Sequence, residues 1–157
     1  MRMTKTTLLT ATAAALLLLA GCADQGRAAA RQLARRNSCI AAELALDAKE
    51  RLASLDTAVA TAQGTPMEQV TVAGHVFATA YRQWADASAR SAALADSAAF
   101  ARSSEDAARF TRESDAARPL PVAHGTVESN AAASYNEDFA RAFGNPDHPC
   151  NKPSEKD

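Results

Sequence analysis

The sequence is short of glycine and contains none of the short motifs on which many enzymes depend. Only six of its 157 residues are glycine, and two of these, Gly21 and Gly26, lie near the N-terminus. It has no phosphate-cradling glycine loop, no Gly-x-Ser-x-Gly turn, no His-Glu-x-x-His and no Cys-x-x-Cys-His motif. These absences argue against the well-known enzyme families, and we expect a non-catalytic protein without a cofactor.

Large apolar residues are also scarce, and neither sign of charge predominates. After residue 21, Leu, Ile, Val and Phe make up 19 of 136 residues, whereas alanine alone makes up 35. The same residues include 15 Lys and Arg and 18 Asp and Glu, which gives a net charge of about −3. A nucleic-acid partner is not expected, because it would require a strongly basic face. Disorder would require a high net charge, so we expect alanine-rich helices with slender interfaces.

The first 21 residues have the pattern of an export signal. Their only charges are Arg2 and Lys5, and an unbroken run of apolar or small residues follows from Leu8 to Ala20. A charged start before a short apolar core is typical of such signals. The run holds 13 residues, whereas a helix needs about 20 to cross the hydrocarbon core. A permanent transmembrane helix is therefore disfavoured.

The run ends in Leu19-Ala20-Gly21-Cys22, which resembles the lipobox of bacterial lipoproteins, where one branched apolar and two small residues precede the modified cysteine. The resemblance covers the signal only. It implies that the Cys22 thiol accepts a diacylglyceryl group, that cleavage frees the Cys22 amine, and that in many bacteria this amine takes a third acyl chain. The alternative is an ordinary secretory signal that happens to contain a cysteine.

Two or three acyl chains would attach the mature protein stably to a membrane and leave its other residues outside the cytoplasm. In enteric lipoproteins, an Asp directly after the lipidated cysteine retains the protein in the inner membrane. Here that position is Ala23, which resembles an outer-membrane address. We therefore expect a lipid-anchored protein of the cell envelope, facing the periplasm from the outer membrane, with an envelope protein as its partner.

Once Cys22 is acylated, Cys39 and Cys150 are the only thiols left. Two cysteines in an oxidising compartment favour a disulfide between them. The alternative is a pair of free, buried thiols. A disulfide would close a loop of about 110 residues and would stabilise the fold by roughly 4–5 kcal/mol on the chain-entropy model.

A long amphipathic helix is predicted from Arg27 to Gln63, because this stretch has no proline or glycine. Its apolar residues recur at helical spacings, namely Leu33, Ile40, Leu44, Ala48, Leu52, Leu55 and Val59. Gly64 predicts a stop, and Thr65-Pro66-Met67-Glu68 has the register of a capping box for a second helix. The short turn predicts an antiparallel hairpin, and the fold class is all-α.

The second helix is expected to end near Arg102. It carries a heptad-like seam of Val70, Phe77 and Trp84, with Ala73, Ala80, Ala87 and Leu94 offset by three. A third helix is predicted from Ser104 to Ala117 behind a capping Ser103, although one continuous helix is the alternative. A linker with Pro119 and Pro121 follows, then a short amphipathic helix marked by Ala132, Tyr135, Phe139 and Phe143.

Three regions follow from these patterns: a signal at 1–21, an alanine-rich helical hairpin at 22–118, and a C-terminal region at 119–157. The last region holds the linker, the short helix ended by Gly144 and Pro146, and an irregular tail. A disulfide would tie that region back against the middle of the first helix.

Four arginines close to Cys22 are candidates for contact with a membrane surface. They are Arg27, Arg31, Arg35 and Arg36, of which three lie four residues apart on one helical stripe. Each would add about 1 kcal/mol of attraction near an anionic leaflet. The competing interpretation is a solvated basic face.

Phe77, Tyr81 and Trp84 form an aromatic group whose spacing favours a buried core over a ligand-facing surface. The histidines His75, His124 and His148 lack the spacing that places two ligands on one helical turn, so no metal site is predicted. We expect a non-catalytic interaction or spacer domain. The alternative is a helical bundle that binds a small ligand or a metal.

Cys22→Ala should abolish acylation and leave the protein unprocessed or released, because no other nucleophile occupies the lipobox position. Mass spectrometry of the N-terminal peptide of both proteins measures this. A wild-type N-terminus at Ala23 or later, without lipid, would contradict the expectation.

Overall fold

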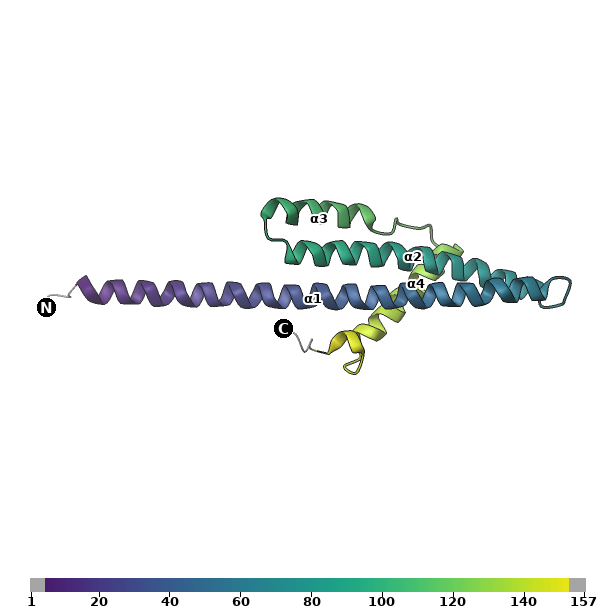
Figure 1. Cartoon of the computed structure of the whole chain (residues 1–157), viewed down its shortest axis with the longest axis horizontal. Coiled ribbons are helices and arrows are strands. Elements are labelled where there is room, and N and C mark those ends of the chain that lie inside the picture. The colour runs from purple at the N-terminus through teal and green to yellow at the C-terminus, as the bar shows by residue number, and fades with distance from the viewer. Residues whose placement is uncertain (1–4, 153–157) are drawn as a thin grey trace. The chain divides into compact units, whose positions relative to one another are not determined.

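The computed structural model describes the backbone of residues 5–152 and the side chains of residues 25–152. Within this part the chain is all-α, with no strand. The elements are α1 (Lys5–Ala62), α2 (Glu68–Phe100), α3 (Ser104–Ala117), α4 (Val127–Gly144) and a short 3-10 helix, η1 (Pro149–Asn151) (Figure 1). The side chains of the expected signal and of Cys22, and residues 153–157 of the expected tail, lie outside the described part.

The chain divides into two units, residues 1–33 and residues 34–157, and α1 continues through the boundary. In the first unit, residues 25–33 are all exposed. No helix among the described residues combines the length and the apolar character that crossing a bilayer would require. The packing described below belongs to the second unit alone.

The hairpin of α1 and α2 is confirmed, but its turn differs from the predicted capping box. Gly64 has a φ of 72°, a left-handed conformation that glycine adopts without strain. The Glu68 carboxylate does reach back, yet it accepts from the Gly64 N–H at 2.9 Å instead of from Thr65. Thr65 bonds back into α1, its own N–H donating to the Ala62 carbonyl at 3.0 Å. The helix therefore begins at Glu68, two residues after Pro66.

Small residues fill the centre of the second unit. Ala48 of α1, Ala85 of α2 and Ala131 of α4 are between 0 and 2 % exposed, and they pack with Tyr81 and Tyr135. Alanine brings helix backbones close together but buries little area for each residue. The two tyrosines therefore supply most of the apolar area of this cluster.

The predicted seam on α2 is wrong at Val70, whose side chain is 64 % exposed, and at Ala73, which is also exposed. Phe77 and Trp84 pack against the core as expected, but the buried positions of α2 are Tyr81 and Ala85. The reason is tertiary: α4 packs on α2 around Tyr81, which meets Tyr135 and Asp138 of α4. The spacing of apolar residues along α2 does not indicate where α4 packs on it.

α3 is a separate helix, so the alternative of one continuous helix is resolved. Ala101 turns the chain with an extended ψ of 139°, and the Ser103 side chain caps α3 by accepting from the Asp106 N–H at 3.0 Å. α3 folds back along α2 (Figure 1). Ser91 of α2 donates to the Ser114 carbonyl at 2.9 Å, and Ser114 of α3 donates to the Ser91 carbonyl at 2.8 Å.

α4 returns the chain to the hairpin after the expected proline-containing linker. Gly125, at a φ of 79°, makes the last bend, and Thr126 caps α4 by accepting from the Ser129 N–H at 3.1 Å. α4 packs against α2, and its buried face carries Ala131 and Tyr135. The expected amphipathic helix and its end at Gly144 are confirmed.

Ala85→Leu should destabilise the fold by about 1–3 kcal/mol, because this position is 0 % exposed and three helices meet around it. Urea denaturation followed by circular dichroism measures the loss. Ala93→Leu, at an exposed position of the same helix, is the matched control and should change stability by less than about 0.5 kcal/mol. Equal stability of both variants would contradict the three-helix core.

Candidate functional site

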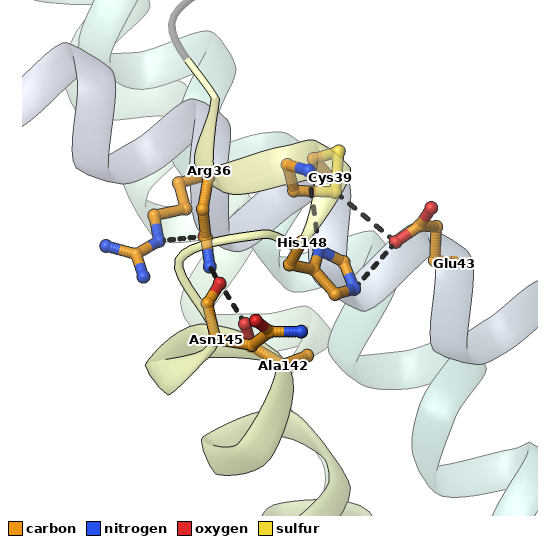
Figure 2. The surroundings of a disulfide bond; sticks show 8 residues. Arg36, Cys39, Glu43, Ala142, Asn145 and His148 are labelled. Carbon is orange, nitrogen blue, oxygen red and sulfur yellow. Dashed lines mark hydrogen bonds and ion pairs between the residues drawn. A yellow bond between two sulfur atoms is a disulfide. The ribbon is translucent and has the colours of Figure 1, made fainter.

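The structure contains the expected disulfide between Cys39 of α1 and Cys150 of η1, 111 residues apart in the sequence (Figure 2). The two Cα atoms lie 5.7 Å apart, a normal separation for a disulfide. The bond ties the C-terminal segment to α1. We call the surrounding group the junction; its members are Arg36, Cys39 and Glu43 of α1 with Phe143, His148, Cys150 and Asn151.

Arg36 takes part in the junction, although its position beside the arginine stripe predicted contact with a membrane surface. Its Nε donates to the Asn151 side-chain oxygen and its Nη2 donates to the Phe143 carbonyl. The guanidinium also lies over the Phe143 ring, with Cζ 3.8 Å from the ring centroid. Arg36 therefore holds the end of α4 against α1.

Arg35 also makes a contact within the second unit, its Cζ lying 4.2 Å from the centroid of the Phe100 ring. Arg27 and Arg31 are exposed residues of the first unit. Arg35 and Arg36 thus have contacts within the second unit. Contact of Arg27 and Arg31 with a membrane stays a prediction.

Asn151 caps the C-terminus of α4, a role that no sequence pattern indicated. Its side-chain Nδ2 donates to the carbonyls of Ala142, at 2.9 Å, and of Asn145. The last carbonyls of a helix have no partner within the helix and must find one elsewhere. The amide of Asn151 satisfies them from the segment that the disulfide holds in place.

His148 and Glu43 face each other beside the disulfide (Figure 2). His148 Nε2 lies 3.2 Å from the Glu43 carboxylate, and His148 Nδ1 accepts from the Cys150 N–H at 3.3 Å. Since Nδ1 is the acceptor, the ring proton of the neutral histidine resides on Nε2 and points to Glu43. Glu43 was not predicted as a site residue from the sequence. The only indication was its position four residues after Cys39, which puts both side chains on the same face of α1.

The other two histidines lie elsewhere. His75 Nε2 is 2.7 Å from the Asp56 carboxylate and links α2 to α1 across the hairpin. His124 is exposed in the linker. The structure brings no two histidines together among the residues it describes.

A cavity of about 230 Å³ adjoins the junction, between α1, α2 and the C-terminal end of α4. Its lining is Leu44, Asp47, Ala48, Arg51, Tyr81, Asp138, Arg141, Ala142, Asn145 and His148. The Tyr81 hydroxyl donates to Asp138 at 2.8 Å, and Arg141 pairs with the other oxygen of Asp138 at 3.1 Å. Burial, and then the hydrogen bond to Asp138, raise the pKa of Tyr81.

Two arginines and two aspartates line the cavity, so their charges cancel. Its volume is smaller than the roughly 300–1,000 Å³ of a typical ligand pocket. Apolar side chains, among them Leu44, Ala48 and Ala142, line it together with the charged groups, and its dimensions suit only a small molecule. No protein-family model matches the chain, and no curated protein or solved structure is significantly similar to it.

Tyr81→Phe should destabilise the protein by about 1.5 kcal/mol at pH 7, because a hydrogen bond to a carboxylate is lost. Burial raises the pKa of Tyr81 and of Tyr135 above the unfolded value of about 10. The folded state therefore retains these protons longer, and stability should fall as the pH rises above about 10. Urea denaturation between pH 8 and pH 11 measures both effects. A wild-type fall no steeper than that of Tyr81→Phe would contradict this assignment.

Proposed function

We propose that this chain is an envelope lipoprotein, anchored through lipid on Cys22 at the periplasmic face of the outer membrane, and that its helical part is a non-catalytic interaction or spacer domain. The lipobox-like signal supports the anchor. The disulfide between Cys39 and Cys150 supports export, because such bonds persist in oxidising compartments and are rare in the cytoplasm.

The observation that carries the interaction role is an exposed apolar segment at the start of α2. It consists of Met67, Val70, Val72 and Val76, whose side chains are between 42 and 64 % exposed. A chain with so few large apolar residues places four of them on the surface within ten positions. Val72 and Val76, four residues apart, share one face of α2. Contiguous exposed apolar residues mark sites of protein or membrane contact. An envelope protein is the partner that fits a domain tethered in the periplasm.

The cavity beside the junction favours one alternative, a helical bundle that binds a small ligand. Arg51, Asp47 and the Tyr81 hydroxyl lie at the cavity wall and could bind polar groups of such a molecule. Native mass spectrometry of protein taken from the envelope distinguishes the two proposals, since a bound organic molecule adds its own mass.

A photo-crosslinking amino acid at Val72 or Val76 should capture a discrete envelope protein in intact cells, because both side chains belong to the exposed apolar segment. The same amino acid at Gln83, an exposed polar position of α2, is the matched control and should give no adduct. Denaturing gels and mass spectrometry of the adducts measure the result.

The anchor is tested in the same cells. Cys22→Ala should give protein without lipid that is either unprocessed or released, and released protein should appear in the soluble fraction and lose the adduct at Val72. The absence of adducts at both valines would contradict the interaction role. Wild-type protein in the soluble fraction would contradict the anchor.

A further inference from the structure

Four side chains of the kinds that bind zinc meet at the junction. Glu43 Oε2 lies 3.2 Å from His148 Nε2 and 3.4 Å from Cys150 Sγ, and Cys150 is bonded to Cys39. The donor atoms of Glu43, His148 and Cys150 all lie within 4.8 Å of one another. The set therefore offers one carboxylate oxygen, one imidazole nitrogen and the Cys150 sulfur close together, with the Cys39 sulfur bonded to that of Cys150.

Besides the disulfide and the contacts among the donors, other features of the local structure help to place them. Cys39 and Glu43 are four residues apart on α1, so both side chains leave the same face of the helix. His148 and Cys150 stand on either side of Pro149 at the start of η1. Arg36 and the cap by Asn151 hold that segment against α1 through contacts that involve neither sulfur.

We propose that, when the Cys39–Cys150 disulfide is reduced, the chain binds one Zn²⁺ through Cys39, Cys150, His148 and Glu43. A thiol or phosphine reductant supplies two electrons; the S–S bond breaks, each sulfur takes up one proton, and the reductant is oxidised. Both thiols release their protons to solvent as the thiolates bind the metal. The proton on His148 Nε2 moves to Nδ1, so that Nε2 binds the metal while the Cys150 N–H loses its acceptor.

The donor set is typical of a tetrahedral zinc site, in which thiolate, imidazole and carboxylate groups bind at about 2.0–2.3 Å. At those lengths the two sulfurs stand about 3.8 Å apart. They must therefore move from their bonded separation of 2.03 Å by side-chain rotation, whereas Glu43 and His148 already face each other at 3.2 Å. Two thiolates and one carboxylate also give the net negative charge that a divalent cation requires.

The disulfide and the metal are alternative links at the same place. Each would tie the segment after α4 to the middle of α1, one in oxidised protein and the other in reduced protein. This role goes beyond the proposed interaction surface on α2 and does not depend on it. The reduced chain would keep its C-terminal segment in place wherever zinc is present.

The test uses the full chain, purified in detergent, reduced with a phosphine, freed of reductant without air, and titrated with Co²⁺ as a spectroscopic substitute for zinc. One equivalent should give a thiolate-to-cobalt band in the near ultraviolet together with the visible bands of tetrahedral Co²⁺. Addition of Zn²⁺ should remove both. The oxidised protein should give neither, since its sulfurs are bonded to each other.

Variants of Glu43 and His148 distinguish a zinc site that uses all four ligands from zinc binding by the two thiolates alone. Glu43→Gln and His148→Ala should each weaken zinc binding by about tenfold or more, since even supporting residues of metal sites contribute that much. Asp147→Asn and Glu50→Gln, exposed carboxylates that neighbour the site in sequence, are the matched controls and should bind as the wild type does.

Three outcomes would overturn the proposal. The first is reduced wild-type protein without tetrahedral bands, and the second is unchanged affinity in both ligand variants. The third is a reduced chain that loses its helical circular dichroism and does not regain it with zinc. Helical signal that zinc restores in the wild type, but not in Glu43→Gln, would support the proposal even if reduction alone unfolds the junction.

Discussion

Tyr135 of α4 packs edge-on against Tyr81 of α2, with 6.0 Å between ring centroids, and this contact joins the C-terminal region to the hairpin. The aromatic series continues on α4 through Phe139 to Phe143, with neighbouring centroids 6.2 and 6.3 Å apart. It ends under the Arg36 guanidinium. A hairpin seam built on alanine buries little area, so the remaining packing depends on the rings that α4 brings.

The junction continues the packing of α4 against the hairpin as far as Asn151. Arg36 binds the last turn of α4, Asn151 caps it, and the disulfide connects the following residues to α1. Arg36 positions the end of α4, and the disulfide positions the segment that carries Asn151. The candidate zinc ligands and the adjacent cavity lie in this region because two distant parts of the chain meet there, and neither part contains the site alone.

Features with local physical causes were predictable from the sequence. The start of α3 follows from a capping serine, and the hairpin follows from Gly64. The disulfide was predicted from the oxidising compartment that the proposed export signal would imply. The inward orientation of Arg36, the exposure of Val70 and the position of Glu43 beside His148 were not predictable. Each depends on where α4 and η1 lie against α1 and α2, which helical periodicity does not encode.

The reciprocal serine bonds between α2 and α3 determine how α3 can move. Each hydroxyl serves the other helix's carbonyl, and Ser114 is only 5 % exposed. A slide of α3 by one helical turn would break both bonds together and leave a buried hydroxyl without a partner. The two bonds therefore fix the register of α3 against α2.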